Sequence, residues 1–346
     1  MLALQKTNPT PGIALQDVAE PTVLEADEVL LRIEAAGICG TDIHIAAWTP
    51  GYEAMAAVMP ITLGHEACGI VEQVGPNVDA ANIGQRVTIR PSVVCHRCTA
   101  CLAGDTDHCS NRRGVGVTRD GAFAAKTVVP FENCVPVPDG LAADIAALCE
   151  PMTVCKEAVD TAGIVAGDKV LVLGPGSIGQ GIALFAEAAG ASTVVICGYD
   201  DEARLSVAQK LGFHNTVDSQ GVGLQKAVAP WLDGDKFDVV IEATGVPSIV
   251  NDALGVLKKR GVLVVAGIHP APASVDLTAM VRNHQQIRGT YRAPEATWPV
   301  VLDFLHANQD RVRHMITHRV VASEAAQGLQ LSASKVASKV MVFQGG

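Results

Sequence analysis

Four cysteines stand within fifteen residues, in the stretch "CHRCTACLAGDTDHC" at 95–109. The spacing C-x2-C-x2-C-x7-C suits a tetrahedral zinc ion, and four thiolates would close its coordination shell, so such a site stabilises a loop and performs no reaction. A disulfide framework, an iron–sulfur cluster and four incidental buried cysteines are the alternatives. We predict a structural zinc site formed by Cys95, Cys98, Cys101 and Cys109.

A second set of reactive side chains lies in two glycine-flanked stretches, "GICGTDIH" at 37–44 and "LGHEACG" at 63–69. They contribute the thiol of Cys39 and the imidazole–carboxylate pair His65-Glu66, and Glu150 follows in "LCEPMTV". One thiolate, one imidazole and a carboxylate or water would make an open zinc site, which is the catalytic kind. Taken singly, the cysteine also fits a small core residue and the pair an ordinary surface pair.

The stretch "LVLGPGSIGQG" contains the spacing Gly174-x-Gly176-x-x-Gly179 between an apolar run and a helical pattern. In a βαβ context the first glycine allows the tight turn, and the second lets the backbone approach a pyrophosphate. The third lets helix and strand pack closely, and the pyrophosphate lies at the positive end of the helix. The motif predicts a dinucleotide site; a tight turn that binds nothing is the alternative.

The strand after this motif would end at Gly198 or Tyr199, where a carboxylate usually binds the adenosine ribose. Neither residue is acidic, but three acidic residues follow at 200–202, and Arg204 is the only nearby cation. Negative charge repels a 2′-phosphate, so we predict NAD as the cofactor, with NADP as the alternative.

The elements that must position these groups follow two different sequence patterns. Residues 1–148 read as short strands broken by Gly, Pro and Asn-rich turns, whereas strands and helices alternate from about Asp168. The later strands are nearly continuous Val, Ile and Leu, which is typical of a parallel sheet covered on both faces. A helix in "EATWPVVLDFLHAN" and a strand in "SKVMVFQ" no longer follow this alternation and are expected to complete the first domain.

Composition narrows the classes of function. The 346 residues suffice for two domains, and 36 acidic against 26 basic residues give a net charge of −10, which disfavours nucleic acid and anionic membranes as partners. No apolar run reaches the ~18 residues of a membrane span, and "MLALQKTNPTPG" does not read as a signal peptide. We therefore expect a cytoplasmic protein.

Taken in order, "GICGTDIH", "GHE", the four-cysteine lobe, "GVGVTRDGAFA", "CEPMTV", "GPGSIGQ" and "EATG" resemble the zinc-containing medium-chain alcohol dehydrogenases. The polyol and threonine dehydrogenase branches are the most similar. The resemblance implies an α/β protein with a GroES-like β-rich catalytic domain (1–150 and 290–346, zinc lobe at about 93–112). It further implies a doubly wound Rossmann cofactor domain at 151–289 and assembly into homodimers or homotetramers.

The resemblance also implies roles for single residues. Cys39 and His65 would be ligands of a catalytic zinc, so that the chain would hold two zinc ions. Glu66 and Glu150 would be ligands or close partners of that zinc, in an order left open. Thr41 and His44 would pass the alcohol proton to solvent. The implied cofactor contacts beyond the glycine motif are Ile178, Tyr199 and Arg204, and the residues implied to line the nicotinamide are Ala266, Gly267, Ile268, Thr290 and Tyr291.

The substrate is less defined by sequence. "ICGTDIHIAAW" and "RGTYRAPEATW" resemble threonine dehydrogenases, whereas "CEPMTV" resembles the sorbitol-type enzymes. Both branches oxidise a secondary alcohol to a ketone, and we expect a polyol or sugar-like alcohol, with L-threonine as the alternative. A non-catalytic NAD- and zinc-binding protein and a nucleic-acid-binding zinc protein are the readings from other classes.

Overall fold

The chain divides into two compact units in a computed structural model that describes residues 1–22, 24–232 and 234–344. The first unit comprises Met1–Glu150, Leu302–Gln309 and Ile316–Gly346, and the second comprises Pro151–Val301 and Asp310–Met315. The sequence suggested a return to the first domain at 290. In the structure, the segment 290–301 stays with the second unit, where the backbone of Thr290 continues the sheet by donating to Val265.

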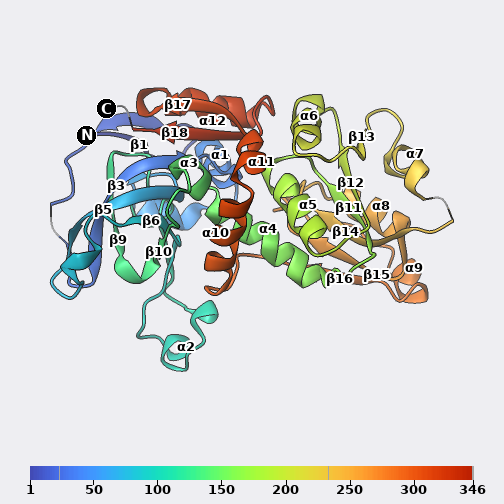
Figure 1. The fold of residues 1–346 in the computed structure, drawn as a ribbon, viewed down its shortest axis with the longest axis horizontal. Helices are drawn as coiled ribbons and strands as arrows, with labels where there is room; N and C mark the ends of the chain where they lie inside the picture. The colour runs from blue at the N-terminus through green and yellow to red at the C-terminus, as the bar shows by residue number, and fades with distance from the viewer. Residues whose placement is uncertain (23, 233, 345–346) are drawn as a thin grey trace. The chain divides into compact units, whose positions relative to one another are not determined.

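The first unit is built from β-sheets (Figure 1). Its elements are β1 (Leu2–Lys6), β2 (Ala14–Asp17), β3 (Glu28–Gly37), α1 (Gly40–Ala47), β4 (Ile61–Thr62), β5 (Glu66–Val74), β6 (Arg86–Ile89), β7 (Ser92–Val93), α2 (Thr99–Leu102), β8 (Arg113–Gly114), β9 (Lys126–Pro130), β10 (Cys134–Pro136), α3 (Ala143–Ala146), β17 (Ile316–Val321), α12 (Ala325–Ala333) and β18 (Lys339–Phe343).

The main sheet has the order β10-β6-β5-β3-β18-β17, with β9 also paired to β3. The last strand thus joins the sheet next to the first long one, as the sequence suggested for "SKVMVFQ". Val29, Leu31 and Ile33 of β3 are buried because apolar side chains at every second position face the same core. The short helix α2 marks the cysteine lobe, which projects from these sheets in Figure 1.

The second unit contains a six-stranded parallel sheet in the order β13-β12-β11-β14-β15-β16. Its strands are β11 (Lys169–Leu173), β12 (Thr193–Gly198), β13 (Thr216–Asp218), β14 (Phe237–Glu242), β15 (Leu257–Val265) and β16 (Gln286–Gly289). Its helices are α5 (Ser177–Ala188), α6 (Glu202–Lys210), α7 (Leu224–Ala227), α8 (Ile249–Val256) and α9 (Leu277–Arg282). Three further helices, α4 (Cys149–Ala162), α10 (Thr297–Ala307) and α11 (Gln309–Val312), contain residues of both units.

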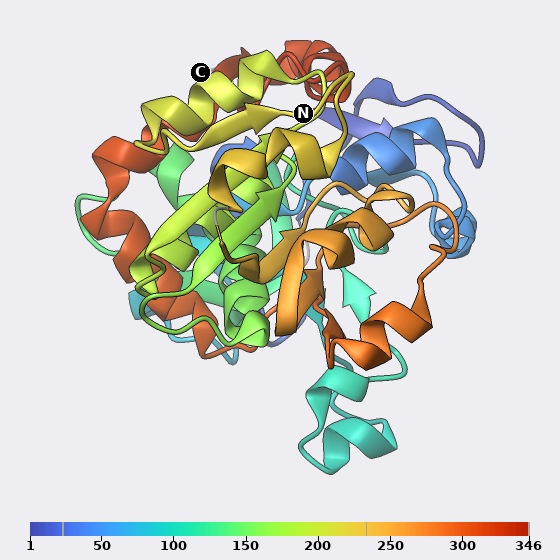
Figure 2. The ribbon, with the colours of Figure 1, turned by 90° about the vertical axis from the view of Figure 1, so that its right-hand side faces the viewer.

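This arrangement confirms the predicted doubly wound α/β fold. Helix α5 packs on β11 and β12, and α8 packs on β14 and β15 (Figure 2). The central strands are buried along nearly their whole length, which explains their unbroken Val, Ile and Leu runs. Parallel strands end at one edge of the sheet, so the loops after β11, β12, β14, β15 and β16 share that edge.

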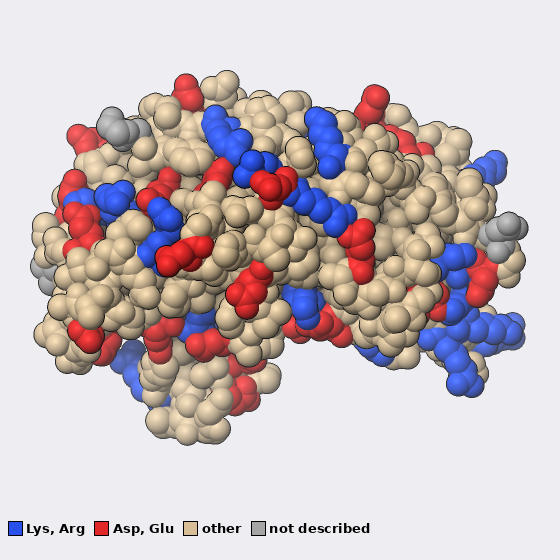
Figure 3. Space-filling model, viewed as in Figure 1, with Lys and Arg blue, Asp and Glu red and all other residues tan. Residues whose placement is uncertain are grey.

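Within the described residues, no helix is both long and apolar enough to cross a membrane. On the face drawn in Figure 3, most of the surface belongs to other residues, Lys and Arg are interspersed with Asp and Glu among them, and a basic group gathers at the lower right.

Candidate active site

The first unit brings Cys39, His65 and Glu66 together. Cys39 follows β3 and precedes the first residue of α1, while His65 and Glu66 stand at the start of β5. Strands β3 and β5 are antiparallel neighbours with Gly37 opposite Glu66, so the ends that carry these side chains coincide. One potential ligand atom from each residue lies within 4.8 Å of the others, as a shared metal ion would require.

Asp42 lies behind this group and is fully buried. Its Oδ2 accepts a hydrogen bond from the backbone N–H of Cys39 at 2.9 Å, and its Oδ1 lies 3.8 Å from Nδ1 of His65. Neither Oδ1 nor Nδ1 has a hydrogen-bond partner within the described chain. In metal sites, a carboxylate next to one ring nitrogen of a histidine orients the imidazole, so that the other ring nitrogen faces the ion.

The electrostatics of the group suit a cation. Burial alone would lower the pKa of His65, but Cys39, Asp42 and Glu150 outweigh it and hold that pKa well above its ordinary value. Burial raises the pKa of Asp42. Anionic groups are therefore crowded around one imidazole, and a divalent ion bound by the thiolate and the imidazole would neutralise this excess. The donor set fits zinc.

Lys339, from β18, contacts Glu66 directly. Its Nζ lies 2.8 and 2.7 Å from the two carboxylate oxygens of Glu66 and donates to the carbonyl of Ile38 at 3.0 Å. Both side chains are almost completely buried. The carboxylate also lies over Gly37, where a Cβ would collide with it. Glu66 is therefore held by a cation as well as being within reach of the metal position.

Glu150, in the first turn of α4, lies outside the three-residue metal group. Burial raises its pKa to about 7; Glu66 and Asp42 add to the shift, whereas His65 and Lys339 oppose it. Glu150 thus belongs to the same charge cluster as the metal group. Of the two glutamates that sequence left open, Glu66 is the one that groups with Cys39 and His65 within 4.8 Å.

Thr41 and His44 both lie on α1, three residues apart and hence on one side of the helix. Thr41 is partly buried and follows Cys39 by two positions, whereas His44 is exposed. Of the pair, Thr41 is thus nearer in sequence to Cys39 and His44 is the more exposed, and their role as a proton relay stays a prediction.

The cysteine lobe also brings its thiols together. The sulfur atoms of Cys95, Cys98, Cys101 and Cys109 all lie within 4.8 Å of one another. Tetrahedral zinc with Zn–S bonds of about 2.3 Å separates sulfurs by ~3.8 Å, so the group fits this ion. Backbone N–H groups of Cys101 and Ser110 lower the pKa of Cys98 to about 5, which favours the thiolate.

The glycine motif of the second unit adopts the predicted conformation. Gly174 directly follows β11 with φ +104°, and Gly176 is the N-cap of α5. A Cβ on Gly179 would collide with the carbonyl oxygen of Gly174, so only glycine allows this close packing. Ile178 is partly exposed on the first turn of α5. The loop fits a pyrophosphate, because the N–H groups that open α5 point towards it.

The end of β12 carries an ion pair in place of a ribose-binding carboxylate. Asp201 is buried and binds Arg204 through both Nε, at 2.8 Å, and Nη2. The guanidinium lies near Gly176, since a Cβ there would approach Nη1 to 3.3 Å. Tyr199 is exposed at the same edge. Arg204 is therefore already neutralised by a neighbour.

The remaining predicted cofactor residues follow β15 and β16, which are adjacent parallel strands. Ala266, Gly267 and Ile268 form the loop after β15, while Thr290 and Tyr291 follow β16. Ile268 and Tyr291 are exposed, and the Thr290 hydroxyl is buried with no partner in the described residues. All the predicted cofactor residues thus lie at one edge of the parallel sheet. Their roles in binding the cofactor stay predictions.

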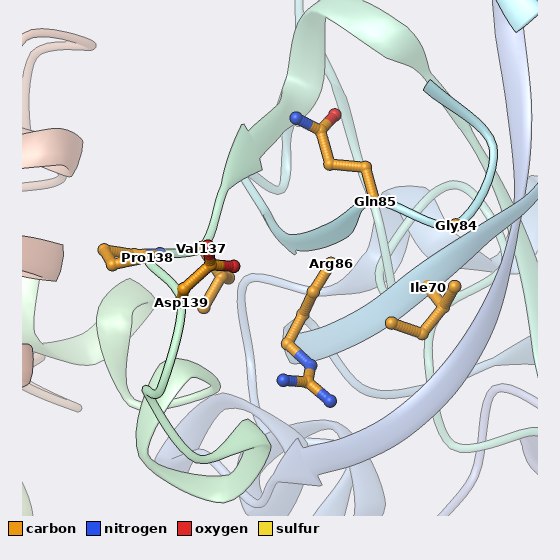
Figure 4. Close-up of a pocket in the computed structure, with 7 residues that line it drawn as sticks. All are labelled: Ile70, Gly84, Gln85, Arg86, Val137, Pro138 and Asp139. Carbon is orange, nitrogen blue, oxygen red and sulfur yellow. The ribbon is translucent and has the colours of Figure 1, made fainter. Parts of the chain in front are cut away.

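A cavity of about 350 Å³ lies elsewhere in the first unit (Figure 4). Its lining residues are Ile70, Gly84, Gln85, Arg86, Val137, Pro138 and Asp139. The guanidinium of Arg86 is paired with Glu34 at 2.7 Å, so its charge is already satisfied. The cavity shares no residue with the metal group or the glycine loop.

Sequence reasoning missed Asp42 and Lys339. Asp42 stands inside the quoted stretch "GTDIH", and the signal was a carboxylate three residues after a candidate ligand. Lys339 is a lone cation at the head of the apolar strand "KVMVF", a position where burial demands an anionic partner.

Two family models match the chain: "Alcohol dehydrogenase GroES-like domain" over residues 25–139 and "Zinc-binding dehydrogenase" over 177–307. An L-threonine 3-dehydrogenase of Rhizobium rhizogenes is 32% identical over 345 residues, covering 99% of this chain and 98% of its own. An L-threonine 3-dehydrogenase of Photobacterium profundum is 34% identical over 343 residues, with 98% of each chain covered.

Solved structures agree with this similarity. A short chain alcohol dehydrogenase of Escherichia coli in complex with NADH is 27% identical, with a TM-score of 0.88 over 99% of each chain. A Sinorhizobium meliloti protein described as a zinc-binding dehydrogenase and bound to NADP is 30% identical, with a TM-score of 0.83 over 99% of this chain and 98% of its own.

Proposed function

Because this chain belongs to the zinc-binding, medium-chain alcohol dehydrogenase family and acts on CH–OH donors, we propose that it oxidises a secondary alcohol to a ketone with NAD. The observation that carries the proposal is the group of Cys39, His65 and Glu66, whose ligand atoms lie within 4.8 Å of one another. It makes an open zinc site in the same chain as a dinucleotide loop.

Zinc, when bound, supplies Lewis acidity that lowers the pKa of an alcohol hydroxyl, and NAD supplies the hydride acceptor. Cys39 and His65 would hold the metal, and the carboxylate of Asp42, 3.8 Å from Nδ1 of His65, would orient the imidazole. Lys339 fixes the carboxylate of Glu66 beside them, and Glu150 adds a carboxyl group to the same charge cluster. The second zinc, in the cysteine lobe, has a structural role.

The chain's own residues also move the proton. Thr41 takes up the hydroxyl proton of the alcohol and passes it to His44, which is exposed and releases it to water. The hydride leaves from the carbon that bore this hydroxyl, so one proton and one hydride depart and a ketone remains.

The preference for NAD rests on Asp201 and Arg204. A 2′-phosphate needs a free cation, and here the guanidinium is paired with Asp201 while Asp200 and Glu202 add negative charge. The relatives with solved structures bind NADH in one case and NADP in the other, so this pair, rather than family membership, supports the choice.

For the substrate we favour a polyol or sugar-like secondary alcohol. L-threonine is the second candidate, because relatives named L-threonine 3-dehydrogenase match along nearly the whole chain. The test is a panel of polyols, L-threonine and simple secondary alcohols, with NAD and then NADP, followed by the absorbance of the reduced nicotinamide. A kcat/KM for L-threonine more than about 10-fold above every polyol would replace the first choice with the second; no turnover of any member would contradict the proposal.

A further inference from the structure

Glu242 joins two loops at the carboxyl edge of the parallel sheet. It ends β14 and is fully buried. Its Oε1 accepts hydrogen bonds from the backbone N–H groups of Thr244 and Gly245, at 2.6 and 2.7 Å, and from the Thr244 hydroxyl. Its backbone carbonyl accepts from Ala266 and Gly267, at 2.8 and 3.1 Å. One residue thus anchors both the loop after β14 and the loop after β15.

His269 completes this junction. Its Nε2 lies 2.9 Å from Oε2 of Glu242, the oxygen that the loop after β14 does not use. Because a carboxylate only accepts, Nε2 carries the hydrogen and donates. The side chain is only 15% exposed, and Nδ1 is buried without a partner in the described residues. Among the described residues, the bond to Glu242 is therefore the hydrogen bond that orients the ring.

The two loops are packed closely against each other. A Cβ on Gly267 would collide with the backbone nitrogen of Gly245, and a Cβ on Gly245 would collide with the carbonyl oxygen of Ile268. The backbone of 266–268 is thus fixed between Glu242 on one side and the His269 ring at its end. These three residues are among those that the resemblance to the dehydrogenase family implies as neighbours of the nicotinamide.

Resting on the proposed NAD-dependent activity, we propose that His269 is a positioning residue for the nicotinamide half of the cofactor, acting through its hydrogen bond to Glu242. The bond preorganises the loop Ala266–Ile268, so that little conformational entropy is lost when the nicotinamide binds. Without it, the loop after β15 keeps its two backbone hydrogen bonds to the Glu242 carbonyl but loses the side-chain tie to the carboxylate, so more of its ordering is left to the ligand.

The test is equilibrium binding of NADH and of ADP-ribose, which lacks the nicotinamide, to the zinc-loaded full chain. His269→Leu removes the donor, and His269→Gln retains an N–H that can reach Glu242. His214→Leu is the control, because His214 is an exposed histidine of the same unit. We expect His269→Leu to raise the Kd of NADH about 10-fold, as loss of one hydrogen bond to a charged group predicts. We expect Gln and the control to stay within about threefold.

ADP-ribose separates this role from a general structural one. Its Kd should remain within about twofold of wild type in every variant, since the glycine loop is untouched. An unchanged Kd for NADH in His269→Leu, an equal loss for ADP-ribose, or a failure of Gln to restore NADH binding would each overturn the proposal. Should His269→Leu not fold, His269→Asn, which is polar but shorter, takes its place with the same expectation. If wild type binds neither ligand, the proposed function itself fails.

Discussion

The side-chain nitrogen of Lys339 lies within hydrogen-bond distance of both carboxylate oxygens of Glu66, although 273 positions separate the two residues. Burial alone would lower the pKa of Lys339, but Glu66 and Cys39 outweigh it and raise that pKa, so the side chain stays charged at neutral pH. The metal group is therefore built on a buried ion pair that only the C-terminal strand can complete.

Removing this cation should be costly. Lys339→Met leaves the buried carboxylate of Glu66 without its cation. We expect the free energy of unfolding to fall by about 3–5 kcal/mol, because removing one partner of a buried ion pair leaves the other charge buried and uncompensated. Urea denaturation measures the loss. Lys339→Arg keeps a cation and should recover more than half of the free energy that is lost in Lys339→Met. Lys210→Met, at an exposed lysine, should change the free energy of unfolding by less than about 1 kcal/mol. Equal losses at both lysines would contradict this account of the pair.

Loss of the Cys39 thiol should empty one metal site and leave the other filled. Cys39→Ala is expected to lower the zinc content from two ions per chain to one and to reduce kcat by at least about 1,000-fold, while NADH still binds within about twofold of wild type. Metal analysis and a binding titration check these outcomes. Cys134→Ala, at a cysteine outside both groups, should keep both ions. Turnover retained by metal-depleted Cys39→Ala, or a single zinc in the wild type, would count decisively against a catalytic metal.

The cysteine lobe should depend on its own ion. Cys98→Ser removes one of four thiolates, and we expect the structural zinc to be lost and the lobe to unfold, since such short polar loops fold only with metal. Trypsin should then cleave at the exposed Arg97 at least ~10-fold faster than in wild type. Cleavage at the wild-type rate would show that the lobe is ordered without its ion.

Cofactor choice should respond to the partner of Arg204. In Asp201→Asn the guanidinium is released, and we expect the ratio of kcat/KM for NAD to that for NADP to fall about 10-fold, as gain of one charged contact to a phosphate predicts. Glu202→Gln removes the same charge from an exposed neighbour that is not paired with Arg204, so it should change the ratio by less than about threefold. Equal effects of the two variants would mean that overall charge, rather than the pair, decides.

The loop that carries Asp201 should loosen in acid. Asp218 is partly buried, which raises its pKa, but the backbone N–H groups of Gln220, Asp200 and Asp201 outweigh this and hold the pKa below its ordinary value. The carboxylate therefore contributes stability above its unfolded pKa of about 4, and this is lost as pH falls through the lower folded value. We expect Asp218→Asn to be less stable than wild type by about 1 kcal/mol at pH 7.

Urea denaturation of both proteins across the acid range checks this dependence. The difference in unfolding free energy between wild type and Asp218→Asn should stay constant from about pH 7 to 5 and narrow below about pH 4. A difference that grows as the pH falls would have the wrong sign for a depressed carboxyl pKa.

Short spacings in the sequence were enough to predict the cysteine lobe and the glycine motif. The four thiols of the lobe are close in sequence, so their meeting required only a short loop, and the glycine motif specifies its own turn because Gly174 and Gly179 touch across five residues. The strands of the second unit were equally legible, since burial on both faces leaves continuous apolar runs. The place of the segment 290–301 was harder to predict, because its attachment to the second unit depends on the edge strand β16.

By itself the sequence determined which ligand types were available and which turns would present them: Cys39 beside one glycine, His65 beside another, and a cofactor loop ahead of α5. Only the tertiary structure decided how Glu66 is held, and it did so through strand register. Gly37 pairs with Met341 on one side and with Glu66 on the other, which carries Lys339 to the carboxylate. Such register depends on packing across the whole sheet, so no local pattern near Glu66 encodes its partner.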